Sequence, residues 1–252
     1  MHDAFTIRTS SLKHRASNKG GQIMFYWDGT IFLLIPAILL SIYAQFRISS
    51  AYKRYSKIRS QSGLTGAQTA RALLNSNGLY DVRVERIGGR LSDHYDPRTR
   101  VINLSDDVYQ GSSLSSVAVA AHETGHALQH ASGYFPMTLR SSFVPVANLG
   151  SGAGPILIMV GLFMPSYGWL LKLGIFAFAF AVLFQIITLP VEYNASHRAL
   201  SILQGGNMLG SEEVRGARSV LNAAALTYVA AALAAVLQLA RLILISRGRS
   251  DD

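Results

Sequence analysis

Four long apolar runs constrain this chain more than any other feature of its sequence. They contain few charged side chains and cover residues 25–46, 144–164, 169–189 and 223–240. A helix needs about 20 apolar residues to cross the hydrocarbon core of a bilayer, and each run has roughly that length. Between the second and third runs, Pro165-Ser166-Tyr167-Gly168 has the composition of a tight turn. The sequence therefore predicts about four transmembrane helices, and the middle two form a hairpin.

The composition agrees with a membrane protein and excludes several other classes. Hydrophobic residues make up 50% of the chain and charged residues only 15%, against about 25% in soluble domains. A net charge of +9 suits either nucleic acid or an anionic membrane surface. The apolar runs decide for the membrane, so we expect a lipid bilayer and no nucleic acid among the partners. With 0 cysteines, disulfides, cysteine-rich zinc fingers and a thiol nucleophile are excluded.

The polar stretch after the first run has its own pattern of short elements. Residues 65–74 have helical periodicity, and residues 81–86 are typical of a strand. Residues 91–95 and 100–104 read as a hairpin around Asp96-Pro97-Arg98-Thr99, with proline at the position that type I turns favour. A helix through residues 117–131 follows, capped by Ser113, Ser115 or Ser116. Small apolar residues on this helix indicate that it is buried. In the second run, glycines indicate close packing against a neighbouring helix, at Gly150, Gly152, Gly154 and Gly161.

The buried helix contains the HExxH pattern, His122-Glu123-Thr124-Gly125-His126. Residues four apart lie on one helical face, so both imidazoles can reach a single zinc ion. The glutamate between them then faces a water molecule on the metal and can act as general base. The simpler alternative is a helix with two solvent-facing histidines. We predict that His122 and His126 bind zinc and that Glu123 is catalytic.

A catalytic zinc needs a third protein ligand, and Glu192 is the strongest choice. Apart from Glu123 it is the only carboxylate between Asp107 and Glu212, and it follows the third apolar run with Pro190 as a possible first residue of a helix. A carboxylate at the membrane boundary is costly unless it is paired or bound to metal. The hairpin also returns Glu192 to the side that holds the histidines. The alternative is a carboxylate that reaches the lipid headgroups.

Other potential ligands fit less well. His130 lies eight residues after His122, a rise of about 12 Å along a helix, so the two side chains cannot share a metal ion. It is expected at the surface or as a partner of a ligand. Four further residues precede the motif in turn-like or capping positions, which is the simpler account of Asp93, His94, Asp106 and Asp107.

These strings resemble the YugP-like zinc-dependent membrane metallopeptidases of bacteria. The match runs from about Met24 to about Leu200, and its marks are residues 25–28, 91–97, 117–129 and 189–200. The resemblance implies a gluzincin-like zinc peptidase in the membrane. The architecture is also similar to the HtpX and CAAX-protease group, in which a transmembrane hairpin separates HExxH from the third ligand. That group has a carboxylate four residues after the ligand glutamate, where this chain has Ser196. The candidates for the partner of a zinc histidine are therefore Ser196, Asn194 and His197.

The expected fold is mainly α, a multi-pass membrane protein with about four transmembrane helices and a small α+β zincin-like catalytic part that carries a short β-hairpin. The first and last segments are a disordered tail or unused upstream start (1–23) and a short tail (247–252). Three segments are expected in the membrane: helix 1 (24–46), the hairpin (144–190) and helix 4 (223–246). The catalytic part is expected in two pieces, the first with HExxH and the second with the third ligand: residues 47–143 and 191–222.

Cations favour a cytoplasmic catalytic part in a bacterial inner or plasma membrane. They crowd the exit of the first run, at Arg47, Lys53, Arg54, Lys57 and Arg59. Two features argue the other way. The segment before Met24 has basic residues of its own, and Arg241, Arg247 and Arg249 would then lie outside.

The predicted activity is hydrolysis of peptide bonds by a zinc-activated water, with a peptide or membrane protein as substrate and Zn²⁺ as cofactor. The candidates for stabilising the oxyanion are Tyr95, Tyr193 and His197. The strand at 100–104 could pair with an extended substrate or could be purely structural. Two other functions remain open: a non-catalytic membrane scaffold or assembly factor, and a zinc hydrolase that acts on a non-peptide substrate.

Overall fold

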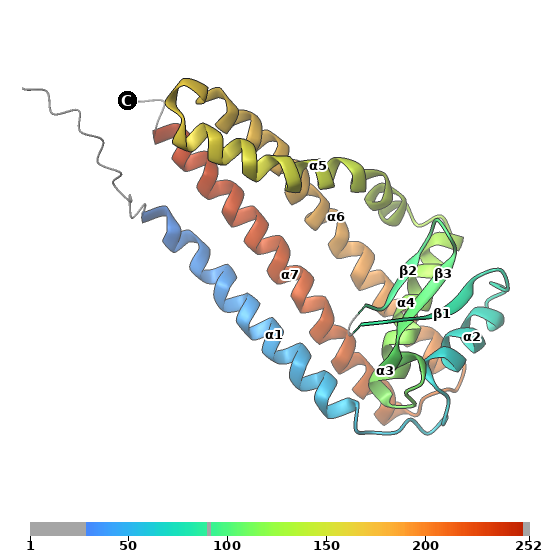
Figure 1. Ribbon diagram of the computed structural model, residues 1–252. Coiled ribbons are helices and arrows are strands. Elements are labelled where there is room, and N and C mark those ends of the chain that lie inside the picture. Colours follow the sequence, from blue (N-terminus) through green and yellow to red (C-terminus); the bar gives the residue numbers. More distant parts are fainter. Residues whose placement is uncertain (1–28, 90–91, 249–252) are drawn as a thin grey trace, which may run out of the picture.

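The computed structural model describes residues 29–89 and 92–248, and most of them are helical (Figure 1). Three predictions fall outside the described residues. They concern residues 1–23, the first residues of the first apolar run (25–28) and Leu91. Four long helices are apolar enough to cross a membrane. They are α1 (Ile35–Tyr55) with the 3-10 turn η1 before it (Gly29–Leu34), α5 (Phe135–Phe163), α6 (Trp169–Gly205) and α7 (Ser211–Gly248). The predicted fold class is confirmed: mainly α, with four helices of membrane-spanning character and a small sheet.

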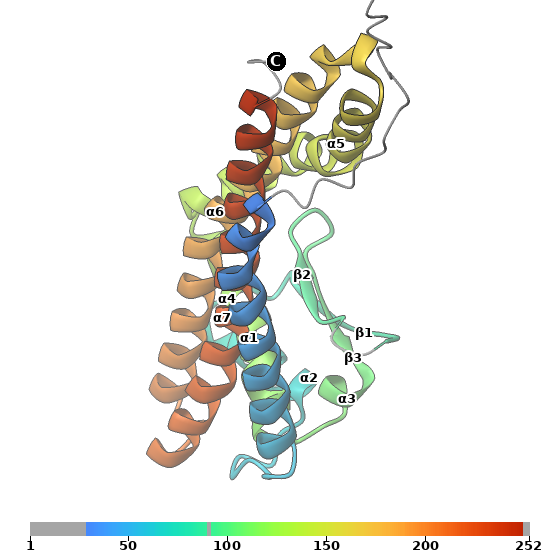
Figure 2. The ribbon, with the colours of Figure 1, turned by 90° about the vertical axis from the view of Figure 1, so that its left-hand side faces the viewer.

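The four long helices stand in a row. α1 packs on α7, α7 on α6, and α6 on α5, and Figure 1 shows them in that order. Seen from the side, the small sheet lies to one side of α1 and α7 (Figure 2). Large apolar side chains remain on the outer surface of the row, such as Phe46 at 70% and Leu149 at 68% exposure. Water-soluble proteins rarely leave so much apolar surface uncovered, so this surface suits lipid.

The predicted hairpin is formed by α5 and α6, joined by the 3-10 turn η2 (Pro165–Tyr167). Glycines on α5 bring the two backbones together. A Cβ on Gly150 would collide with the carbonyl of Ala177, and one on Gly161 would collide with the backbone of Leu171. Without a strong hydrophobic driving force in lipid, such close packing is the main attraction between helices. The glycine-rich run therefore packs closely, as its sequence predicts.

Pro190 lies inside α6, which continues without interruption on both sides of it. Our interpretation of Pro190 as the first residue of a helix is therefore wrong. The residues before it already have helical geometry, so the proline removes a single hydrogen bond within a long helix. One continuous helix thus carries both the third apolar run and Glu192. Similarly, residues 211–222 form the first turns of α7.

A three-stranded sheet packs against the helix that carries the HExxH motif. Its order is β1 (Arg83–Ile87), β3 (Val101–Ser105) and β2 (His94–Asp96). β3 is parallel to β1 and antiparallel to β2, which gives the predicted hairpin. Asp96 stabilises its turn by accepting a hydrogen bond from the Arg98 amide at 2.8 Å. For the strand at 100–104 we left two alternatives open, pairing with a substrate or a purely structural role. This strand is β3, and both of its edges are paired, so it cannot accept a substrate strand and its role is structural. Among the described strands, the outer edges belong to β1 and β2.

The remaining helices begin at residues with capping side chains or directly after a strand. α2 (Gly66–Ser76) starts with a capping box between Thr65 and Gln68. α3 (Asp106–Tyr109) is a single turn that connects β3 to the loop before α4. α4 (Leu114–Ala131) is the predicted motif helix, and Ser113 caps it by accepting a hydrogen bond from the Ser116 amide.

α4 lies at the centre of the folded region and is packed on two sides. Val117, Ala118 and Ala121 pack against residues of α6 and α7. Ala120 and Ala127 pack against residues of α2 and of the sheet. These small side chains let both layers approach the helix closely. The position of the HExxH helix is therefore fixed by the core.

Candidate metal centre

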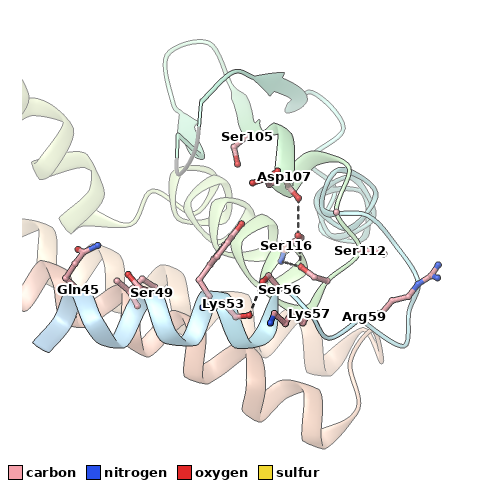
Figure 3. Close-up of a pocket in the computed structure, with 14 residues that line it drawn as sticks. Gln45, Ser49, Lys53, Ser56, Lys57, Arg59, Ser105, Asp107, Ser112 and Ser116 are labelled. Carbon is pink, nitrogen blue, oxygen red and sulfur yellow. Dashed lines mark hydrogen bonds between the residues drawn. The ribbon is translucent and has the colours of Figure 1, made fainter.

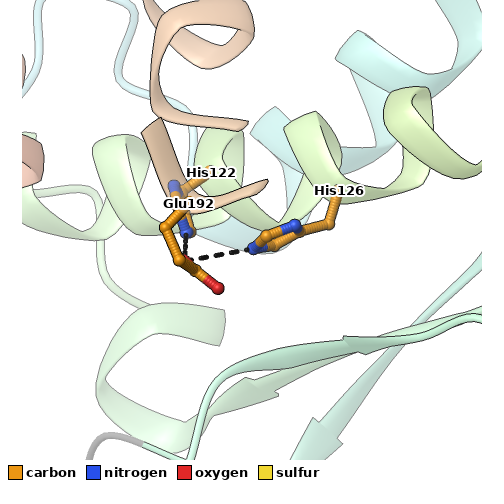
Figure 4. Close-up of side chains that lie close together, drawn as sticks. All are labelled: His122, His126 and Glu192. Atoms are coloured by element: carbon orange, nitrogen blue, oxygen red, sulfur yellow. Dashed lines mark hydrogen bonds and ion pairs between the residues drawn. The ribbon is translucent and has the colours of Figure 1, made fainter. Parts of the chain in front are cut away.

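His122 and His126 lie one turn apart on α4, and their imidazole rings turn toward α6 (Figure 4). The ring centroids are 4.7 Å apart in an edge-to-face arrangement. His126 is buried and His122 is partly buried. The four-residue spacing thus places both nitrogen donors on the inner side of the helix.

α6 can approach this face because residue 125 is a glycine. A Cβ on Gly125 would collide with the backbone carbonyl of Ala195. Ala195 is three residues after Glu192, so the two lie on nearly the same face of α6. Within α4 the glycine lowers helix stability by about 1 kcal/mol relative to alanine. It also lets Glu192 come within reach of the two histidines.

The three side chains converge on one point. Oε2 of Glu192 is 3.3 Å from Nε2 of His122 and 3.6 Å from Nε2 of His126. The donor atoms of the three residues lie within 4.8 Å of one another, and within the described residues this is the group that could hold a metal ion. Donors that coordinate zinc tetrahedrally at about 2.0–2.1 Å are themselves about 3.4 Å apart. Two imidazoles and one carboxylate at these distances fit zinc.

The Nδ1 atom of each histidine, on the side of the ring away from Glu192, contacts a neutral polar side chain. Nδ1 of His122 is 3.2 Å from Oγ of Ser196. Nδ1 of His126 is 3.0 Å from Oε1 of Gln129, an arrangement in which Nδ1 carries the proton and Nε2 is free to bind a metal. The amide of Gln129 also donates to the carbonyl of Val191 at 2.7 Å and to Oδ1 of Asn194 at 3.0 Å. Gln129 therefore ties the histidine on α4 to the turn of α6 that carries the glutamate.

Glu123 lines the same cleft but does not belong to the group of converging donors. Its side chain is almost completely buried, with 6% exposure. Burial raises the pKa of the Glu123 carboxyl to about 7; His122 opposes this rise, and the negative charge of Glu192 adds to it. A carboxyl group with a pKa near neutrality can both accept and release a proton.

The converging donors open into a cleft of about 540 Å³. The edge strand β2 and the residues next to it form one wall, from Asp93 to Arg98. The other walls come from α1, α5 and α7, including Tyr52, Arg140 and Tyr228. The cleft is therefore enclosed by all four long helices together with α4 and the sheet.

Arg140 and Tyr228 are residues that our reading of the sequence missed. Nη1 of Arg140 is 3.9 Å from Oε1 of Glu192, the oxygen that faces away from the histidines. Its guanidinium carbon is 5.8 Å from the ring centroid of Phe184. Among the described residues its buried Nε has no hydrogen-bond partner. Neither residue has a fixed spacing from HExxH, so only the packing of α5 and α7 could reveal them.

The other residues named from the sequence lie as follows. Tyr95 lines the cleft, and its hydroxyl is 2.8 Å from Nδ1 of His130. Tyr193 and His197 are exposed and do not line the cleft. Asp93 accepts hydrogen bonds from Ser105, and Asp106 pairs with Arg86. Asp93, His94, Asp106, Asp107 and His130 are outside the converging group.

The chain matches known proteins over nearly its whole length. The model of a family described as "Putative neutral zinc metallopeptidase" matches residues 30–247. "Putative membrane protease YugP" of Bacillus subtilis (strain 168) is 49% identical over 222 residues, which cover 88% of this chain and 98% of that protein. No solved structure matches the chain.

Proposed function

The chain belongs to this zinc metallopeptidase family, and we propose on that premise that it is a membrane-embedded, gluzincin-like endopeptidase. The observation that carries the proposal is the convergence of His122, His126 and Glu192 on one point beside Glu123. Zinc is the metal of the family, and this donor set fits it. His122, His126 and Glu192 would be the protein ligands.

When bound, zinc would polarise the carbonyl of the scissile peptide bond and make a water molecule acidic near neutral pH. Glu123 accepts the proton of the attacking water and delivers it to the nitrogen of the leaving amine. Its raised pKa suits both transfers. Arg140 and Tyr228 line the same cleft and can donate hydrogen bonds to the carbonyl oxygen as negative charge develops on it.

An extended substrate can bind along the edge strand β2. This strand lines the cleft through residues 94–96, and its outer edge is unpaired among the described strands. Backbone hydrogen bonds to β2 would hold the substrate in an extended form regardless of its sequence. The scissile bond would then pass the converging donors.

We also propose that residues 47–143 and 191–222 act together as one catalytic part. α4 comes from the first segment, and the second segment supplies the end of α6 and the start of α7, both of which pack on α4. The hairpin between the two segments lies in the membrane. In this arrangement neither segment contains the complete donor set.

The protein is proposed to be a multi-pass protein of the cell membrane with its catalytic part in the cytoplasm. The cations at the end of α1 support a cytoplasmic location, because loops rich in Lys and Arg are retained in the cytoplasm. Reporters fused after Arg59 and after Ser211 should both give a cytoplasmic signal. A reporter in the turn at 165–168 should give the opposite one. Different signals at Arg59 and Ser211 would refute the topology.

The test of the activity is digestion of an unfolded protein by the purified full-length chain in detergent. Cleavage should require zinc and stop with a chelator. Glu123→Gln should keep its zinc and lose roughly 10²–10⁴-fold in rate, because it cannot accept the proton. Unchanged cleavage by Glu123→Gln would refute the mechanism. Cleavage of non-peptide esters alone would indicate another hydrolase, and zinc-free, inactive protein would indicate a scaffold.

A further inference from the structure

The cleft lies at the level where the apolar run of each long helix begins or ends. Ile48 and Tyr52 on α1 come one and five residues after Arg47, the first residue beyond the first run. Glu192 on α6 comes three residues after the third run ends at Leu189. The other two helices contribute wall residues near the start of their runs, namely Ser141, Val144, Ala224 and Tyr228. The donors therefore lie just outside the hydrocarbon core.

A second pocket, of about 740 Å³, shares lining residues with the cleft; Figure 3 shows this second pocket. It lies between α1 and the segment that carries Ser105, Asp107 and Ser116. Ile48 and Tyr52 line both cavities, so the two share one wall. A chain that leaves the cleft along α1 would pass directly into this pocket.

The lining of the second pocket is polar and basic. Hydroxyl groups come from both sides of it, at Ser49, Ser56, Ser112, Ser113 and Ser116. Three cations line it, Lys53, Lys57 and Arg59, against a single carboxylate among the lining residues, Asp107. Within the described parts of the chain, none of these three cations forms an ion pair. Their charge is therefore available to a ligand, and an anionic one is favoured.

The basic end of the second pocket lies farther from the membrane than the cleft. The pocket extends along the chain from Gln45 to Arg59, with its cations at the far end, whereas α1 lines the cleft only with Ile48 and Tyr52. From Ile48 to Ser56 the helix rises about 12 Å, which corresponds to about four residues of an extended chain. Moving away from the bilayer, a substrate would meet lipid, then the cleft, then the basic end of the pocket at Lys53, Lys57 and Arg59. This order matches a chain in which an apolar segment is followed within a few residues by acidic or polar ones.

We infer that the substrate is a membrane-anchored chain, cut immediately outside its apolar segment, whose acidic continuation lies in the basic pocket beside α1. This inference rests on the proposed peptidase function. Anchoring in the same bilayer raises the effective concentration of the scissile bond at the cleft. Lys53 and Lys57 then select among anchored chains by charge.

The first test varies the distance between anchor and cleavable segment. Full-length protein and substrate are placed together in phosphatidylcholine vesicles with zinc. One fluorogenic segment is attached about four residues (the near substrate) or about 20 residues after a single apolar span, and is also supplied as a soluble peptide. The near substrate should be cut more than about tenfold faster than either of the others. Equal rates for all three substrates would overturn the inference and leave the peptidase function intact.

If no substrate is cut, the peptidase function fails and binding decides the inference. Fluorescence anisotropy of the labelled near substrate with Glu123→Gln should then show saturable binding that the soluble peptide lacks. Absence of this difference would overturn the inference as well.

The second test compares two neighbouring cations on α1. Lys53 lines the pocket, whereas Arg54 lines neither cavity and has its guanidinium 5.4 Å from the ring of Tyr55. Lys53→Glu should raise KM about tenfold for a near substrate with two glutamates after the scissile bond, because like charges then face each other. Its kcat should change little, and a substrate with two glutamines should show a small effect only. Arg54→Glu should leave both substrates unchanged.

Two results would overturn the role of the pocket. Equal changes in KM for Lys53→Glu and Arg54→Glu would indicate a general surface-charge effect. A change in Lys53→Glu that occurs only in vesicles containing anionic lipid, and not with acidic substrate, would indicate that the pocket holds a lipid headgroup.

Discussion

The metal centre in the cleft and the basic pocket beside α1 are built differently. On the α4–α6 wall, Gln129 and Glu192 are buried, and the amide of Gln129 is fully partnered. In the basic pocket, Lys53 and Lys57 are exposed, and α1, which forms one side of the pocket, packs mainly on α7. A metal site needs donors fixed to within a fraction of an ångström, whereas a substrate site must accept varied side chains. We therefore expect changes on the α4–α6 wall to alter zinc binding and changes in the basic pocket to alter KM.

Among changes at the metal centre, Glu192→Ala should cause the largest loss of zinc binding and activity. This change leaves two histidines as protein ligands. Loss of a residue that only hydrogen-bonds to a ligand weakens metal binding roughly 10–100-fold, so loss of the ligand itself should weaken zinc binding by more than that. It should also abolish turnover. Glu192→Asp should retain part of the metal with poor activity. Zinc content by mass spectrometry and affinity by chelator competition measure this. His130→Ala is the control and should keep its zinc; loss of zinc there with retention in Glu192→Ala would refute the ligand assignment.

Gly125→Ala should have the next largest effect. The added Cβ collides with the carbonyl of Ala195, so α6 must move away from α4. We expect a loss of about 1–3 kcal/mol in stability and, because the donors are displaced, about a 10²-fold loss of activity. Gly152→Ala on α5 is the matched control, since a Cβ on Gly152 would meet nothing within 4 Å. Thermal unfolding in detergent, with and without zinc, should separate the two; identical behaviour would contradict close α4–α6 contact.

Gln129→Leu should produce an intermediate loss. It removes the partner of His126 and leaves the carbonyl of Val191 without its donor, so we expect zinc affinity to fall about 10–100-fold. Gln129→Glu restores an acceptor for His126 but not the donor, and should recover part of the affinity. Ser196→Ala, the matched change behind His122, should have a smaller effect because its contact is longer, at 3.2 Å. Unchanged affinity in Gln129→Leu would show that the amide is not a positioning group.

The smallest effect on zinc is expected from Lys53→Glu, in the basic pocket. This side chain lines the basic pocket and has no ion pair with any described residue. Its zinc dissociation constant should stay within about twofold of the parent, because exposed charges at a distance are screened by water and salt. Isothermal titration with zinc measures this. A loss as large as that of Gln129→Leu would break the distinction between the metal centre and the basic pocket.

The sequence predicted those features that depend on local pattern. The HExxH spacing, the serine cap of α4 and the four apolar runs each follow from residues close together in the chain. Glu192 could be named because it is almost the only carboxylate in a long stretch. In each case the physical constraint, helical periodicity or the cost of burying a charge, acts within one segment.

Features that depend on packing between distant segments could not be predicted. The pairing of β3 on both edges depends on β1, which a hairpin pattern does not reveal. The residues around Pro190 are typical of a helix start, but the long apolar helix α6 continues through it. Arg140 reaches the cleft only because α5 packs on α6, and Tyr228 only because α7 does. Gly125 stands inside the motif, but the sequence does not reveal that the backbone of Ala195 packs against it.

The hairpin separates His122 and His126 from Glu192 along the chain, and this separation has a consequence for biosynthesis. The ribosome makes the histidines of α4 first, and Glu192 emerges only after two further apolar runs. Until both runs have entered the bilayer and turned back, the third donor is not beside the other two. A nascent or misinserted chain therefore lacks the complete centre. On the proposed function, we therefore expect proteolytic activity only from a correctly inserted chain.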